Sequence, residues 1–135
     1  MPSILRSILA VFAGILSVVV LSEGTDAVLR SAGVFPPLDD QASYTNEMLA
    51  AATVYRTLAG VVGGYVAAAL APANPMRHAV ILGAIGLALS IAGVVANEMN
   101  HLGPTWYPIA LAITAFPSAW LGGRLRSGST RAVQS

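Results

Sequence analysis

Acidic and basic side chains stand at the ends of apolar segments in this chain, where they could form a binding site. Glu98 and His101 lie three residues apart, about one helical turn, directly after an apolar run. Glu23 and Asp26 have the same spacing at the end of the first apolar run. Residues at this spacing share one face of a helix, so their carboxylates and imidazole could bind a polar solute or an ion.

An arginine and an asparagine complete this predicted polar group. Arg56 falls inside the second apolar run, and an arginine within a membrane span usually faces the protein interior and needs a partner. A rise of about 1.5 Å per residue brings Arg56 to a depth similar to those of Glu23 and Glu98. We therefore expect a carboxylate partner for Arg56, and we favour Glu98 over Glu23. The predicted site comprises Glu23, Asp26, Arg56, Asn97, Glu98 and His101.

Three interpretations of the predicted polar group stay open. In the first it is structural: Arg56 ties its helix to a neighbour, and the other residues cap or wet helix ends. In the second it is an outward-open pocket for a small solute, an ion or a lipid headgroup. In the third Glu23, Asp26, Glu98 and His101 bind a metal. Carboxylate-bridged metal bundles repeat the Glu-x-x-His motif, but this chain has it once, so no metal and no cofactor is predicted.

Four apolar segments must position these residues. The chain is 56% hydrophobic and only 10% charged, whereas a soluble domain is about a quarter charged. Each segment is long enough to cross a hydrocarbon core about 30 Å thick, and backbone groups in lipid must be satisfied internally, which favours helices. The sequence predicts an all-α polytopic membrane protein, an up-down bundle of four transmembrane helices. The helices are 4–29, 48–71, 79–97 and 106–123, forming one domain, 1–123, with a polar cytoplasmic tail, 124–135.

The positions of the arginines orient these helices. If the chain crosses four times, five arginines share one side of the membrane, and only Arg30 lies on the other. The positive-inside rule makes the arginine-rich side cytoplasmic. We therefore expect a multi-pass protein of a bacterial cell inner membrane with both termini in the cytoplasm. The five arginines are Arg6, Arg77, Arg124, Arg126 and Arg131.

Small residues form a stripe on each of the two middle helices. In lipid, close backbone approach across small residues favours helix association. The two stripes predict that the second helix packs directly on the third. The alternative is that a glycine-rich face holds a homo-oligomer or a larger membrane complex together. The stripes are Ala52, Arg56, Gly60, Gly63, Ala67 and Ala71 on the second helix, and Ala79, Gly83, Gly86, Ser90, Gly93 and Asn97 on the third.

Several function classes are excluded or disfavoured by composition and motifs. Without cysteine the chain has no disulfides or thiolate metal sites. It has no basic block of the kind that nucleic-acid binding needs, so no nucleic-acid partner is expected. No Gly-rich phosphate loop follows a strand, and no serine has a histidine and an acid arranged around it, so an enzyme is the least favoured of the function classes considered.

In outline, a short chain with four predicted helices and an acid, Glu23, in the first of them, the sequence resembles the small multidrug-resistance transporters. In that family the acid lies in the middle of the membrane, whereas Glu23 lies near the outer end of its helix, so we assign no family. We expect an integral membrane protein of non-catalytic role, an accessory or scaffold component of a membrane assembly. The alternative is a small transporter or binding protein with a polar pocket in the outer leaflet.

Overall fold

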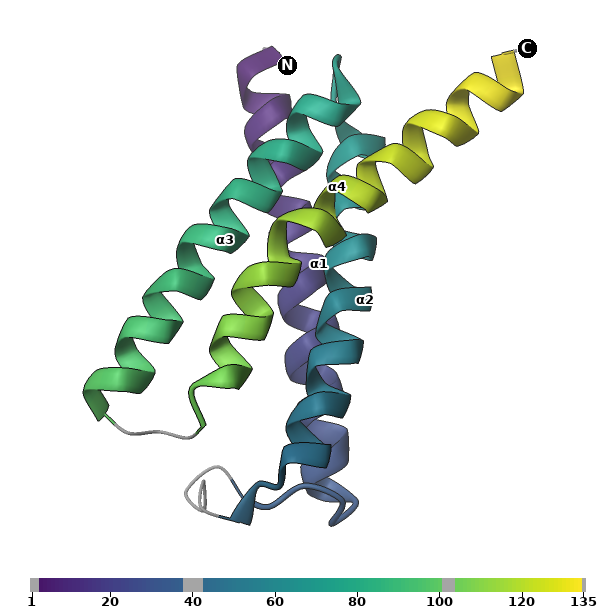
Figure 1. Cartoon of the computed structure of the whole chain (residues 1–135). Helices are drawn as coiled ribbons and strands as arrows, with labels where there is room; N and C mark the ends of the chain where they lie inside the picture. Colours follow the sequence, from purple (N-terminus) through teal and green to yellow (C-terminus); the bar gives the residue numbers. More distant parts are fainter. Residues whose placement is uncertain (1–2, 38–42, 101–103, 135) are drawn as a thin grey trace.

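Four long helices form the structure (Figure 1). The computed structural model describes residues 3–37, 43–100 and 104–134. The all-α prediction is confirmed. Within these described ranges three helices, α1, α2 and α3, are long and apolar enough to cross a membrane. The helices are α1, Ser3–Ser31; α2, Asn46–Leu70; α3, Pro75–Asn100; and α4, Trp106–Gln134.

Local signals in the sequence set the ends of α1 and α2. α1 ends before Gly33, which has a positive φ of 78°, the left-handed conformation that closes many helix C-termini. The Val34 N–H then donates to the Leu29 carbonyl at 2.9 Å. α2 begins after Thr45, whose side chain accepts a hydrogen bond of 3.2 Å from the Met48 N–H. A threonine at this position satisfies a backbone donor that the first helical turn leaves free.

Two helix ends differ from the sequence prediction by four residues or more. α3 begins at Pro75 rather than at 79, because a proline in the first turn has no hydrogen bond to lose and a φ suited to a helix. α4 continues to Gln134, so the predicted tail extends the last helix. Polar residues mark the end of an apolar segment, but they do not end a helix. The helix changes direction near its middle (Figure 1), where Pro117 lies inside it.

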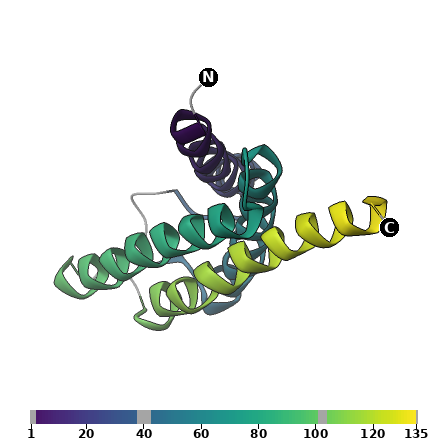
Figure 2. The same ribbon diagram turned by 90° about the horizontal axis from the view of Figure 1, so that it is seen from above.

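α4 packs between α2 and α3. Seen from above, α3 and α4 run side by side, and α1 lies apart from α4 (Figure 2). α2 and α3 touch, but each packs more extensively on α4 than on the other. The second helix does contact the third, as predicted, but the two small-residue stripes do not form one shared seam. The stripe of α3 faces α4, and the stripe of α2 faces mainly α1, with Gly60 next to Ser118 of α4.

Glycines allow these close approaches. A Cβ on Gly64 would collide with the backbone of Ala119 in α4, and one on Gly83 would lie 3.1 Å from the Phe116 ring. On the other side of α2, a Cβ on Gly14 of α1 would lie 2.8 Å from the Gly63 carbonyl oxygen. Helix backbones thus approach one another directly, as small residues allow in lipid.

Small side chains fill the interior, and large apolar ones face outward. In the described part of the chain no large side chain is fully buried. Phe12, Leu58 and Met99 are instead exposed. This distribution is the reverse of a water-soluble core and fits helices surrounded by lipid. The buried alanines are Ala10, Ala52, Ala59, Ala67, Ala68, Ala79 and Ala119.

Candidate functional site

An ion-pair cluster, which we define as Glu23, Asp26, Tyr55 and Arg56, joins α1 to α2. Arg56 donates from Nη2 to Oδ2 of Asp26, and the Tyr55 hydroxyl donates to Oδ1. Both carboxylate oxygens of Asp26 therefore have a partner. Oε1 of Glu23 lies 3.7 Å from Nη2 of Arg56. Asp26 is buried whereas Glu23 is largely exposed, so Asp26 is the main counter-charge of Arg56.

The local structure of α1 explains why Asp26 faces α2. The buried residues of α1 are Ala10, Gly14, Ser22 and Asp26, which lie in a row of every fourth residue. Such a row winds slowly around a helix, and helices that pack along it cross at an angle. The predicted carboxylate partner for Arg56 is thus confirmed, and Glu23 belongs to the cluster. The preference for Glu98 is wrong, because α4 separates most of α2 from α3.

The remaining predicted site residues lie elsewhere or are not described. Glu98 is exposed near the end of α3, and its Oε1 accepts a hydrogen bond of 2.6 Å from the Thr105 hydroxyl. Asn97 is buried on α3. His101 lies outside the described residues. The structure therefore brings together Glu23, Asp26 and Arg56, and it separates Glu98 from them. Within the described ranges no three histidine, aspartate or glutamate side chains gather to hold a metal.

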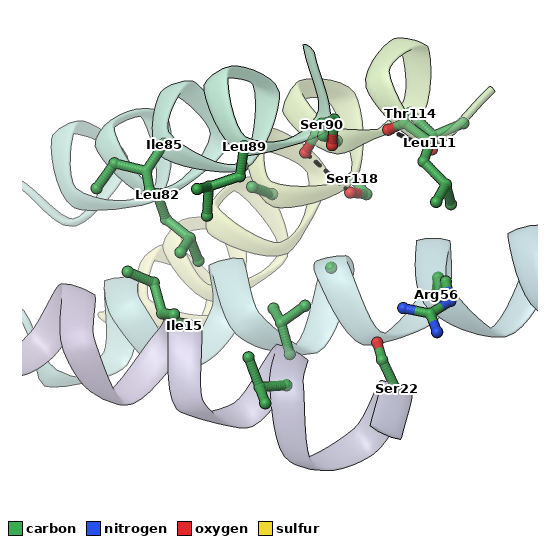
Figure 3. A pocket seen from close by; sticks show the side chains of 16 residues that line it. Ile15, Ser22, Arg56, Leu82, Ile85, Leu89, Ser90, Leu111, Thr114 and Ser118 are labelled. Carbon is green, nitrogen blue, oxygen red and sulfur yellow. Dashed lines mark hydrogen bonds between the residues drawn. The ribbon is translucent and has the colours of Figure 1, made fainter. Parts of the chain in front are cut away.

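A cavity of about 230 Å³ lies between the helices beside the ion-pair cluster. It is larger than the roughly 150 Å³ apolar cavity that is known to bind benzene in another protein. Ser22 and Arg56 lie at one end of it, while Ile15 and Leu82 line the other part (Figure 3). Most of the wall is apolar. Its residues are Ile15, Val18, Val19, Ser22, Arg56, Gly60, Leu82, Ile85, Gly86, Leu89, Ser90, Leu111, Thr114, Ala115, Ser118 and Ala119.

Two polar atoms at the end of this cavity are buried without a hydrogen-bond partner in the described part of the chain. They are Oγ of Ser22 and Nε of Arg56. The two side chains come from α1 and α2 and point toward each other (Figure 3). A buried donor or acceptor without a partner costs about 1–3 kcal/mol. The site therefore has a hydrogen-bonding end that the protein itself leaves unsatisfied.

Three residues of the site were not predicted. Ser22 lies four residues before Asp26 and so shares its row, and Tyr55 directly precedes Arg56. Tyr107 of α4 is close enough to interact electrostatically with the Arg56 guanidinium. The sequence contained a signal for Ser22, a small polar residue one turn from a buried acid. It contained none that separates Tyr107 from the aromatic residues that commonly lie at a membrane interface.

The arrangement places charged, unsatisfied polar and apolar groups next to one another. Asp26 and Glu23 offset the charge of Arg56, and the apolar wall continues from the unsatisfied atoms into the bundle. Comparison of the chain with protein-family models, with curated protein sequences and with solved structures found no match. Function is therefore argued from this geometry.

Proposed function

We propose that this chain is a small binding protein of the membrane that holds a small, largely apolar molecule in the cavity of its bundle. The observation that carries this proposal is the cavity of about 230 Å³ with Ser22 Oγ and Arg56 Nε unsatisfied at its end. A sealed structural ion pair would use all the polar atoms of its residues. This one leaves Nε of Arg56 unsatisfied, next to the unsatisfied hydroxyl of Ser22, and both residues line a space that is large enough for a ligand.

The proposal includes the topology expected from the sequence. The chain crosses a bacterial cell inner membrane four times, with both termini in the cytoplasm. Contact between Gly123 of α4 and Met76 of α3 supports this, because it brings Arg124 level with Arg77 at one end of the bundle. Arginines gathered at one end are typical of a cytoplasmic face.

Photolabelling tests whether the cavity binds such a molecule. The purified protein, in lipid vesicles, is labelled with octanol that carries a photoreactive diazirine, and the adducts are mapped by mass spectrometry. We expect saturable adducts on cavity residues such as Ile85 and Leu111. Unlabelled octanol in excess should suppress these adducts but not the adducts on lipid-facing residues such as Phe12.

A matched pair of variants on α3 controls for changes in the bundle. A Cβ on Gly86 would make only an ordinary contact, 3.7 Å from Ala115, and Gly86 lines the cavity. Gly86→Leu should therefore fill the cavity and abolish the saturable adducts. Gly93 has open space beside it, so Gly93→Leu should keep them. Equal labelling of the two variants, both eluting as folded protein, would refute a ligand in this cavity.

An accessory role in a membrane assembly is the second candidate function. It is favoured by the outer half of α3, where Gly93 lies open between the exposed side chains of Leu89, Ile91 and Val95. A second helix could approach this face closely, from another copy of the chain or from a different membrane protein. Because the chain has no cysteine, Gly93→Cys provides a clean test. Disulfide-linked dimers in native membranes would support a homo-oligomer, and their absence would argue against one.

A further inference from the structure

We infer that the cavity selects an uncharged amphipathic molecule, one whose hydroxyl or similar group sits between Ser22 and Arg56, and that this molecule enters from the bilayer between α1 and α3. The inference rests on the proposed function and names the chemical class of its ligand. Four observations support it: the hydrogen bonding of the hydroxyl groups, the charge of the ion-pair cluster, the apolar wall of the cavity, and the exposure of the residues at its opening.

The hydroxyl of Ser22 differs from its neighbours on α1. Ser17 donates to the Ala13 carbonyl at 2.9 Å, and Thr25 donates to the Leu21 carbonyl at 2.6 Å. Serine and threonine hydroxyls in apolar helices commonly donate to a backbone carbonyl of the preceding turn in this way. Ser22 is only 3% exposed, and its hydroxyl has no hydrogen-bond partner among the described residues. It is therefore an unsatisfied group at the edge of the cavity that Ser22 lines.

The charge of the ion-pair cluster disfavours a charged ligand. Arg56 already faces two carboxylates, those of Asp26 and Glu23, so an anion would add a third negative charge beside them. A cation has no acceptor for the Arg56 Nε–H and would meet the guanidinium directly. Either ion would also lose its hydration in an apolar cavity, which is costly. An uncharged group avoids all of these costs.

A ligand hydroxyl matches both unsatisfied atoms. Nε of Arg56 carries a hydrogen and can only donate, whereas the Ser22 hydroxyl can donate or accept. A ligand hydroxyl that accepts from Nε can donate its own hydrogen to Oγ of Ser22. A carbonyl oxygen could accept from both groups. Either arrangement satisfies the two buried atoms with one uncharged group.

The rest of the cavity wall suits a hydrocarbon chain or ring. Two of the three other hydroxyls in it are already engaged: Thr114 donates to the Ala110 carbonyl at 3.0 Å, and Ser118 donates to the Ala115 carbonyl at 3.0 Å. Ser90 is the third. Beyond Ser22 and Arg56, α1, α3 and α4 contribute mainly aliphatic side chains. The ligand is therefore amphipathic, polar at one end only.

The rim of the cavity faces the hydrocarbon region. Val19 of α1 and Leu89 of α3 both line the cavity, and they are 48% and 64% exposed. α1 packs much less extensively on α3 than on α2, and it does not pack on α4 within the described residues. The opening between α1 and α3 thus has apolar edges, and a membrane-dissolved molecule can reach the cavity without passing through water.

Competition among four octyl compounds tests the selectivity. Octanol, octylamine, octanoate and octane are each added, at equal concentrations in the vesicle membrane, to protein labelled with the diazirine octanol. We expect octanol to compete best, with octane on the order of tenfold weaker, the ratio that one buried hydrogen bond can produce. The amine and the carboxylate should also be weaker than octanol, because each brings a charge into the apolar cavity.

Two serine variants locate the hydrogen bond. Ser22→Ala should remove most of the advantage of octanol over octane. Ser17→Ala is the matched control on the same helix, because the Ser17 hydroxyl already bonds to its own backbone, and it should leave that advantage unchanged. If octanol and octane compete equally with the native protein, a water molecule satisfies the two atoms and the inference is overturned. Stronger competition by either charged compound also overturns it.

The route is tested through the rate of labelling. Val19→Trp narrows the opening between α1 and α3 and should slow saturable labelling. An unchanged rate would contradict access from the bilayer at this place. If no octyl compound competes with the native protein at all, the proposed function itself fails, so the two failures are distinguishable.

Discussion

Asp26 and Arg56 depend on each other because both are withdrawn from water. Removing one partner of a buried pair leaves the other charge uncompensated, which costs on the order of 3 kcal/mol. We expect Arg56→Ala to lower the free energy of unfolding by about this amount. Arg56→Ala combined with Asp26→Ala should be more stable than Arg56→Ala alone. Unfolding in mixed micelles with a denaturing detergent, followed by circular dichroism, measures both effects.

Glu98→Gln is the control for this prediction. The Glu98 side chain is exposed, and it is hydrogen-bonded to Thr105 rather than to Arg56, so the substitution should change stability little. An Arg56→Ala protein as stable as the native one would show that the pair contributes nothing. A large loss of stability in Glu98→Gln would show that Glu98 does interact with the ion-pair cluster.

Tyr55 contributes a single hydrogen bond to the same carboxylate. Tyr55→Phe removes the hydroxyl that donates to Asp26 and should cost about 1 kcal/mol. The comparison is Tyr65→Phe, which keeps the ring that Arg126 approaches at 5.9 Å. The same detergent titration applies to both variants. If the two substitutions have equal effects, the hydroxyl of Tyr55 is not specifically bonded.

At the scale of helices, the backbone contacts of α4 decide which glycines matter. A Cβ on Gly122 would collide with the Val61 carbonyl and lie 2.7 Å from the Tyr65 nitrogen. Because backbone atoms cannot rotate away, Gly122→Leu should destabilise the bundle by about 3 kcal/mol or more. Gly93→Leu, which enters open space, should be tolerated. Elution profiles and thermal melts of the two variants check this. If both substitutions are tolerated equally, α4 does not pack closely on α2 at Gly122.

The sequence predicted the positions of the helices along the chain better than it predicted which helices pack on one another. Long apolar runs identified all four helices, and the burial of Arg56 identified its need for a carboxylate. The choice of Glu98 as the partner of Arg56 failed for a geometric reason. On a straight face of α1, Asp26 and Gly14 point in different directions. The row of every fourth residue winds around the helix and includes both, so both pack on α2. The position of α4 depends on fits such as Ser118 against Gly60. Such fits are properties of two surfaces together, and neither sequence segment reveals them alone.

At the scale of the whole molecule, α4 determines the topology. Three helices are apolar and long enough to cross, and a crossing by α4 returns the C-terminus to the side of the N-terminus. We expect a reporter fused after Gln134 to be cytoplasmic and one inserted after Gly33 to be external. A reporter at Ala73, between α2 and α3, should also be cytoplasmic and serves as the control. An external C-terminus, with the other two as expected, would mean that α4 does not cross.

The pairing of Asp26 with Arg56 has a consequence for how the chain is made. α1 leaves the ribosome first and carries Asp26 to the membrane before Arg56 has been synthesised. A single Asp or Arg adds about 2.5–3.5 kcal/mol to the free energy of insertion at the centre of a span, which is an upper bound for Asp26 near the end of α1. When α2 follows, each charge meets the other, and both penalties fall together. We therefore expect α1 to wait beside the insertion machinery, so that the two helices enter the lipid as one hairpin.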